Sequence, residues 1–194
     1  MALACGLRIG EALGLAWNDV NMKTGEVQIR QQLQIVNKRL VLQPLKTDKS
    51  RRTLVLPNVC LDALRIHRTR QLKERLKAGA AYQDTGLVFT TYAPRGRKTT
   101  VGGALYPRNA LRTLHALQQQ AGVPRTRFHD LRHTAASLLI ANGVELVEVS
   151  QLLGHSQFSV TADLYAHLQK QTAAKAAKHM QALFAAKKGG TQNL

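Results

Sequence analysis

The stretch HDLRHTAASLLIAN, residues 129–142, has the periodicity of an amphipathic helix and constrains the fold more than any other segment. At about 100° per residue, His129, Arg132 and His133 project from one helical face. The other side carries Leu131, Ala135, Leu138, Leu139 and the polar Asn142. We therefore expect one face to pack on a core, while the other presents nitrogen donors to an anionic group. Taken alone, these residues fit equally well two structural histidines and a surface ion pair, because a short motif is only a hypothesis.

Two more polar side chains follow this helix closely in sequence. Gly143 stands where a left-handed residue would end the helix, and ELVEVSQLLG from Glu145 predicts a second, shorter helix closed by Gly154. His155 therefore follows directly after a helix end. The next segment, SQFSVTADLYAH, lacks strand alternation and predicts another short helix, which carries Tyr165.

An ion pair is expected near the start of the chain, in the segment GLRIGEALGL. Arg8 and Glu11 are three residues apart and share one helical face, so Glu11 can orient the guanidinium. In isolation, an ordinary exposed ion pair is the favoured interpretation, because such pairs are common and weak.

A β region follows this helix. Three strands are predicted, over residues 26–36, 39–44 and 50–56, and the third is rich in Thr, Val and Leu. Asn37 and Lys38 form a plausible tight turn between the first two strands. The 45–49 loop before the third strand carries Lys46 and Lys49, and lysines at a hairpin tip are usually solvated.

The middle of the chain predicts two further helices. One runs from Asn58 to about Lys77, and the other starts at Pro107, which suits a first helical turn, and ends at Gln120. The predicted fold class is therefore mainly α (α+β), a helical bundle with a small three-stranded antiparallel sheet near the N-terminus.

Composition indicates a nucleic-acid partner. The 28 Lys and Arg residues against 11 acidic ones give a net charge of +17. Many of the basic residues are spread from Arg51 to Arg127, as expected for a domain that follows a phosphate backbone. No apolar run is long enough to cross a membrane. Cys5 and Cys60 alone argue against a disulfide framework, so we expect a cytoplasmic protein.

Five fragments, taken in order, carry a family resemblance: GLRIGEALGL, PLKTDKSRRT, HDLRHT, LLGH, and Tyr165 followed by Ala-His. Over residues 3–170 the chain resembles the catalytic domain of the tyrosine recombinase (phage integrase) family. Each fragment is weak alone, but five ordered matches are very specific.

The resemblance implies a role for six residues. It makes Arg8 and Arg132 the two arginines of a phosphate clamp, with His129 and His155 as the histidines beside it. Lys46 matches the general acid, with Lys49 as the nearby alternative, and Tyr165 matches the nucleophile.

The implied activity is site-specific cleavage and rejoining of double-stranded DNA through a covalent 3′-phosphotyrosine, with neither metal nor nucleotide cofactor. His129 and His133 have an i, i+4 spacing that can hold zinc, but there is no HExxH glutamate and Arg132 lies between them, so a zinc site is disfavoured.

The resemblance also implies a domain organisation and partners. Residues 1–170 form the catalytic domain, 171–188 a C-terminal helix that packs on a neighbouring protomer, and 189–194 a flexible tail. Because Met1 stands only seven residues before Arg8, the domain is expected to lack the family's upstream helices and core-binding domain. The expected partners are double-stranded DNA, further copies of the chain in a tetrameric synapse, and accessory DNA-bending or directionality factors.

Two alternatives remain open at this point. One is a truncated, non-catalytic DNA-binding remnant of an integrase, and the other is a relaxing topoisomerase with the same tyrosine chemistry. The complete set of six residues favours an active recombinase, and the local amino-acid sequence around Tyr165 favours a mobile-element integrase.

Overall fold

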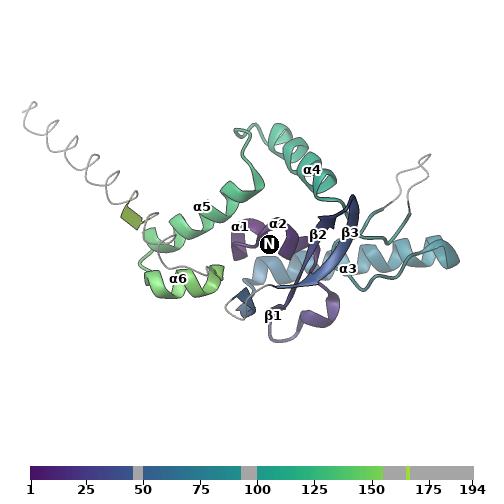
Figure 1. The fold of residues 1–194 in the computed structure, drawn as a ribbon, viewed down its shortest axis with the longest axis horizontal. Coiled ribbons are helices and arrows are strands. Elements are labelled where there is room, and N and C mark those ends of the chain that lie inside the picture. Colours follow the sequence, from purple (N-terminus) through teal and green to yellow (C-terminus); the bar gives the residue numbers. More distant parts are fainter. Residues whose placement is uncertain (46–49, 93–99, 155–164, 167–194) are drawn as a thin grey trace, which may run out of the picture.

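The computed structural model describes residues 1–45, 50–92, 100–154 and 165–166 (Figure 1). It has the mixed α+β class that the sequence predicts. The α-helices of this part are α1 (Ala2–Cys5), α2 (Ile9–Leu13), α3 (Asn58–Ala78), α4 (Pro107–Gln120), α5 (Phe128–Ala141) and α6 (Leu146–Leu153). Two short 3₁₀ helices, η1 (Trp17–Asp19) and η3 (Gly79–Ala81), also belong to the described part.

The helix ends lie where local sequence signals place them. Pro107 occupies the first turn of α4, where its missing N–H costs no hydrogen bond. Gly143 follows the end of α5 with a φ of 83°, and Gly154 caps α6 with a φ of 64°. Both glycines adopt the left-handed conformation that reverses the chain after a helix, so the predicted stop signals are confirmed.

The β region differs in detail from the single three-stranded sheet that we expected. Its strands are β1 (Glu26–Ile29), β2 (Gln31–Val36), β3 (Arg39–Pro44) and β4 (Arg52–Val55). In the described part they form two antiparallel pairs, β1 with β4 and β2 with β3. The strand predicted over residues 26–36 is thus interrupted at one residue, and its halves take different partners.

The interruption lies at Arg30. Its guanidinium forms an ion pair with the buried Asp19 of η1, and its carbonyl oxygen accepts a hydrogen bond from the N–H of Leu45 at 3.1 Å. These contacts take the residue out of the β1–β4 ladder. The turn between β2 and β3 is as predicted, because Asn37 and Lys38 have φ values of 47° and 64°, the conformation of a tight hairpin turn.

Helix α2 packs so closely on β2 that it requires glycine at the contact. A Cβ added at Gly14 would lie 2.8 Å from backbone atoms of Gln32 and Leu33, and one at Gly10 would lie 3.0 Å from the Leu33 carbonyl oxygen. The side-chain amide of Gln31 also donates to the Gly14 carbonyl oxygen at 2.8 Å. Helix α2 is therefore fixed against the strand.

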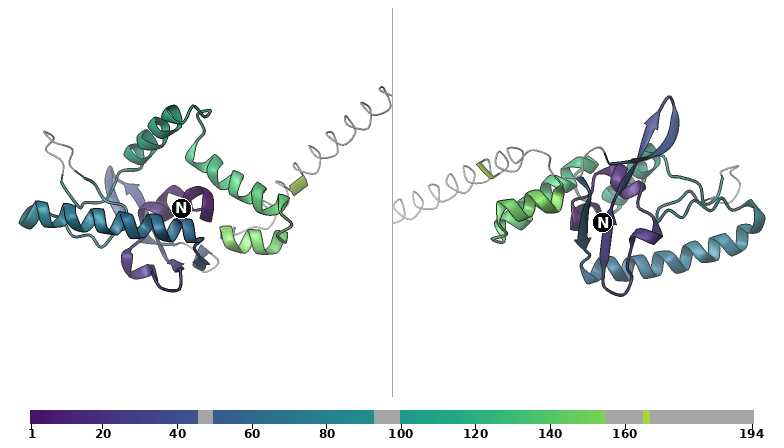
Figure 2. Two further views of the ribbon diagram at one scale, coloured as in Figure 1. Left: turned by 180° about the vertical axis from the view of Figure 1, so that it is seen from behind. Right: turned by 60° about the horizontal axis from the view of Figure 1, so that its bottom comes forward.

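Two apolar clusters hold the described part together. The larger one joins α1, β1, β4 and the first half of α3, and it includes Leu7, Val27, Ile29, Leu54 and Leu64. The smaller one lies between α5 and α6 and consists of Ala136, Val149 and Leu153 with flanking side chains. Figure 2 shows α5 and α6 side by side next to α1. Among the described helices, none combines the length and apolar character needed to cross a membrane.

We expect Gly14→Ala to destabilise the protein by about 1–3 kcal/mol, because the new methyl group overlaps the β2 backbone. Gly103→Ala is the control, because the nearest neighbour of its added methyl group, at 2.8 Å, is the end of the flexible Gln83 side chain, which can move aside. Urea denaturation followed by circular dichroism measures both. Equal stabilities for the two variants would contradict the close packing of α2 on β2.

Candidate active site

Arg8 and Glu11 form a half-buried ion pair at the start of α2. The Arg8 N–H donates to Glu11 Oε2 at 2.9 Å, and Arg8 Nη1 lies 2.7 Å from Glu11 Oε1. The Arg8 side chain is 38% exposed, whereas that of Glu11 is fully buried. The interpretation as an ordinary exposed pair is therefore wrong, because the carboxylate faces the core.

Arg132 also lies in the interior, although its helix was expected to turn this side chain outward. It is 2% exposed, on the same face of α5 as Ala135 and Ala136, which follow it by three and four residues. Arg132 Nη1 donates to the Gly6 carbonyl oxygen and Nη2 to that of Leu153, both at 2.6 Å. These two hydrogen bonds replace those that the guanidinium would make to water if it were exposed.

Arg52 is the residue of this site that sequence reasoning missed, since it was grouped with the dispersed basic residues. Its side chain is 6% exposed and contacts Glu11 through two nitrogens, at 3.3 and 2.9 Å. Strand alternation could have revealed it: Arg52 lies on the same side of β4 as the buried Leu54 and opposite the exposed Thr53.

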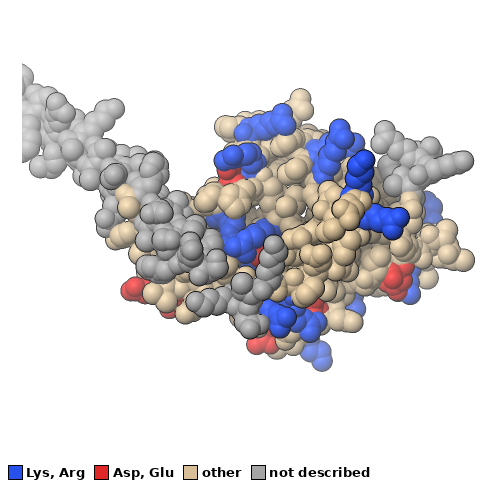
Figure 3. Space-filling view, viewed as in Figure 1, with Lys and Arg blue, Asp and Glu red and all other residues tan. Residues whose placement is uncertain are grey.

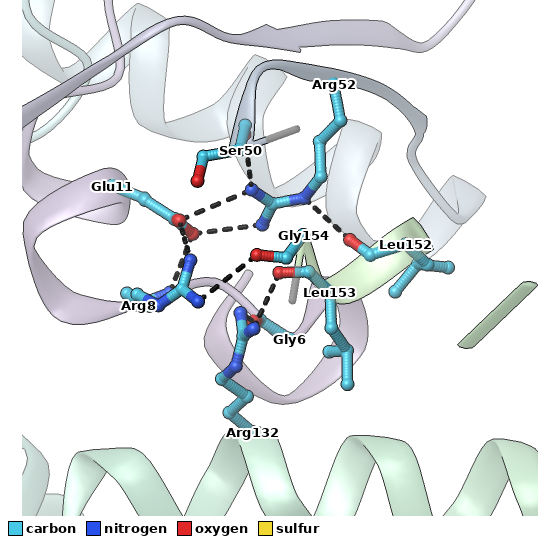
Figure 4. A network of polar contacts seen from close by, with 9 residues as sticks. All are labelled: Gly6, Arg8, Glu11, Ser50, Arg52, Arg132, Leu152, Leu153 and Gly154. Atoms are coloured by element: carbon cyan, nitrogen blue, oxygen red, sulfur yellow. Dashed lines mark hydrogen bonds and ion pairs between the residues drawn. The ribbon is translucent and has the colours of Figure 1, made fainter. Parts of the chain in front are cut away.

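The three arginines converge on the C-terminal end of α6 (Figure 4). The carbonyl oxygens of residues 152–154 accept, in chain order, from Arg52 Nε at 2.6 Å, Arg132 Nη2 at 2.6 Å and Arg8 Nη2 at 3.2 Å. Carbonyls at a helix C-terminus have no partner within the helix and carry the negative end of its dipole. The positive side chains therefore fix the end of α6 between α2, β4 and α5.

The charges of this site are unbalanced. Burial alone would raise the pKa of Glu11, but the hydrogen bonds and charge of Arg52, followed by those of Arg8, outweigh burial and lower it. Burial, with the charge of Arg8, lowers the pKa of the Arg132 guanidinium to about 9, so the group is still charged at neutral pH. Two guanidinium groups thus contact the Glu11 carboxylate and a third, that of Arg132, lies close enough to be influenced by its charge. A bound anion would relieve the mutual repulsion of the three cations.

His129 lies beside the exposed side of Arg8. Both residues line a cleft of about 360 Å³ between α2, β2 and the start of α5. The rings of His129 and His133 meet edge to face with centroids 4.5 Å apart. Partial desolvation, then the charges of His133 and Arg132, lower the pKa of His129. At neutral pH this imidazole is therefore uncharged and can accept a proton.

The remaining predicted site residues are placed less centrally or lie outside the described part. Lys46, its alternative Lys49, and His155 are outside the described residues. Tyr165 is half-buried and helical together with Ala166. Figures 1 and 2 show residues 165–166, the yellow-green piece, beside the end of α5 that leads to α6. The structure thus brings Arg8, Arg132 and His129 together, while Tyr165 lies apart from them.

We expect Glu11→Gln to lower the free energy of unfolding at pH 7 by about 3 kcal/mol, because two arginines lose a buried counter-charge. Asp62→Asn is the control: this carboxylate pairs with Arg65 at the surface, and the change should stay within about 0.5 kcal/mol. Urea denaturation measures both. A similar loss in the two variants would contradict the role of the buried carboxylate.

This difference should also depend on pH. The folded state lowers the pKa of Glu11 from its ordinary value of 4.5, so the ionised carboxylate contributes stability that is fully present above pH 4.5 and is lost as pH falls through the folded-state pKa. Wild type and Glu11→Gln should therefore converge in stability in acid. A difference in the free energy of unfolding that stays constant from pH 7 to pH 3 would contradict a stabilising role of the ionised Glu11 carboxylate.

Comparison with known proteins gives consistent matches. A tyrosine recombinase XerC-like protein of Caldanaerobacter subterraneus subsp. tengcongensis is 36% identical over 95% of this chain and 48% of its own length. An integrase of Streptomyces ambofaciens is 36% identical over 85% of this chain and 42% of its own length. The chain thus spans about half the length of these relatives.

A solved structure and a family model agree with them. The structure of the Tn1549 transposon integrase, in complex with transposon right end DNA, matches with a TM-score of 0.68 over 93% of this chain and 56% of that one. At 20% identity, this match shows the shared fold. The model of the phage integrase family matches residues 1–172. With its ordered motifs, its fold and the two relatives at 36% identity, the chain belongs to the phage integrase family.

Proposed function

We propose that this protein is a tyrosine-type site-specific DNA recombinase, which cleaves and rejoins double-stranded DNA. The observation that carries the proposal is the cluster of Arg8, Arg52 and Arg132 at the end of α6, where Glu11 is the one carboxylate among the described residues that pairs with them. A buried cluster with excess positive charge suits a phosphodiester, whose nonbridging oxygens gain negative charge as a nucleophile attacks.

Arg8 and Arg132 are the proposed phosphate clamp. A guanidinium has five N–H donors, and contacts to described residues use two side-chain donors of each arginine. Further donors of both groups are available to the nonbridging oxygens, and their planar geometry permits bidentate binding. The exposed part of Arg8, which lines the cleft, gives the phosphate access to the pair.

The proposed reaction is a transesterification. The oxygen of Tyr165 forms a bond to phosphorus, and the bond from phosphorus to the 5′ oxygen breaks. His129 accepts the phenolic proton, and Lys46 gives a proton to the departing 5′ oxygen, so that charge and protons balance. His155 donates to a nonbridging oxygen. The product, a 3′-phosphotyrosine, retains the bond energy for rejoining to another DNA end, so the step requires no cofactor.

The nucleophile must reach the clamp on DNA. Roughly ten residues connect Gly154, whose carbonyl oxygen binds Arg8, with Tyr165, and an extended segment of this length spans up to about 35 Å. This connection is long enough to carry the phenol to a phosphate held by the arginines.

The surface charge supports DNA as the partner. Figure 3 shows Lys and Arg side chains gathered over α4 and the β2–β3 hairpin on the face in view. Exposed basic residues of these elements are Lys38, Arg39, Arg108 and Arg112. Cations in such positions bind the DNA backbone without reading sequence, and they raise its local concentration.

The wider setting is also part of the proposal. The integrases among the relatives support a mobile-element origin, and the two free, buried thiols of Cys5 and Cys60 suit a reducing cytoplasm. Assembly as a tetramer on DNA, with accessory factors, follows from the family resemblance. Residues 171–188, the helix proposed to dock on a neighbouring protomer, lie outside the described residues.

We expect a covalent protein–DNA adduct on nicked duplexes. A nick a few nucleotides downstream of the cleavage point lets the released fragment diffuse away, which prevents rejoining. Because the target sequence is unknown, the substrate is a pool with randomised positions, and adducts are recovered on denaturing gels. Tyr165→Phe removes the attacking oxygen and should abolish the adduct, while Tyr106→Phe, at an exposed tyrosine outside the motifs, should keep it. DNA binding without any wild-type adduct would identify a non-catalytic remnant instead.

We expect the cleavage rate to fall in acid as His129 gains a proton and can no longer accept one from the phenol. Its pKa is lowered from 6.5, so this fall should lie below pH 6.5. His129→Gln should be slow and lack this acid limb. His133→Ala removes a charge that lowers the pKa of His129, so its acid limb should move toward pH 6.5. An acid limb that persists in His129→Gln would assign the base role to another group.

A further inference from the structure

Arg52 connects three separate segments of the site. It begins β4, and its nitrogens contact the Glu11 carboxylate, the Leu152 carbonyl oxygen at 2.6 Å and the Ser50 carbonyl oxygen at 3.2 Å. Every one of its side-chain nitrogens therefore contacts a protein oxygen. Because protein oxygens occupy all three nitrogens, Arg52 is placed to hold other groups rather than to bind substrate.

Its first partner, Glu11, is shared with Arg8. Arg52 makes two contacts to the carboxylate oxygens, at 3.3 and 2.9 Å, and Arg8 contacts the same carboxylate at 2.7 Å. Without Arg52, this buried carboxylate would have Arg8 as its sole cationic partner among the described residues. Arg8 would then be held more tightly by Glu11 and would be less available to a phosphate.

Its second partner is the end of α6. Arg52 Nε binds the carbonyl of Leu152, and a Cβ added at Gly154 would lie 2.9 Å from Arg52 Nη1. The same helix end receives Arg132 and Arg8 on the next two carbonyls. Arg52 therefore sets where the carbonyls that orient both of these arginines lie.

We propose that Arg52 is a positioning residue, which holds Glu11 and the end of α6 so that the guanidinium groups of Arg8 and Arg132 face one phosphate. This inference rests on the proposed recombinase function. It assigns to the residue a task that lysine cannot perform, because one ammonium group cannot span the carboxylate and the helix end with a fixed planar geometry.

The test compares two DNA substrates with the same preparation of each variant. One carries the normal phosphodiester, and the other a methylphosphonate, in which an uncharged methyl replaces one nonbridging oxygen at the cleavage point. The rate of cleavage at the neutral methylphosphonate depends less on positive charge in the clamp than the rate at the phosphodiester does. The ratio of the two rates is independent of the fraction of folded protein, so loss of stability alone cannot change it.

We expect Arg52→Lys to cleave the phosphodiester about 100-fold more slowly than wild type. On the methylphosphonate this deficit should shrink by about an order of magnitude, as it should for Arg8→Lys and Arg132→Lys. Arg75→Lys is the matched control, because Arg75 pairs with Asp84 at the surface and should keep the wild-type rates. Wild-type cleavage by Arg52→Lys, or the same deficit on both substrates, would overturn the inference.

A second variant covers the case in which Arg52→Lys does not fold. The double change Glu11→Gln with Arg52→Gln removes both buried charges together, which costs less than leaving one unpaired. We expect it to fold, to cleave the phosphodiester slowly and to recover on the methylphosphonate. A folded double variant with the same deficit on both substrates refutes the positioning role. Absence of an adduct from wild type itself would instead refute the proposed function.

Discussion

The buried carboxylate of Glu11 is the charge on which the polar network of this protein depends. Removing a carboxylate from water costs several kcal/mol, and the cost is recovered only when well-placed cations surround it. Arg8 and Arg52 provide them, at contact distances of 2.7 and 2.9 Å. Because Arg52 also binds the end of α6, one buried charge links the beginning of the chain to residues 152–154.

Apolar packing places the same residues. Helix α2 starts at Ile9, directly after Arg8, and the two glycines of this region allow it to lie against the β2 backbone. The adjacent Leu7 is fully buried in the larger cluster, so the chain is fixed on both sides of Arg8. The guanidinium thus projects from a rigid support, as preorganised binding of a phosphate requires.

Sequence reasoning predicted the parts of the molecule that local chemistry decides. Proline at the start of α4 and glycine after α5 and α6 gave helix ends close to the observed ones. The break at Arg30, the burial of Arg132 and the partners of Arg52 were not predictable in this way. Each depends on a partner supplied by folding, such as the carbonyl of Leu152, which lies 100 residues after Arg52. For all six residues assigned from the family motifs, the catalytic roles remain predictions.

The separation of these partners along the chain has a consequence for how the protein is made. Arg8 is synthesised 146 residues before its partner carbonyl at Gly154, and Arg132 is synthesised 126 residues after its partner carbonyl at Gly6. Contacts that close such long loops form late, because much chain entropy is lost before they contribute. A nascent chain that stalls before α6 is complete therefore contains all three arginines without the helix end that organises them. The charged network around Glu11 is therefore complete only after residues 152–154 have been synthesised and α6 has folded.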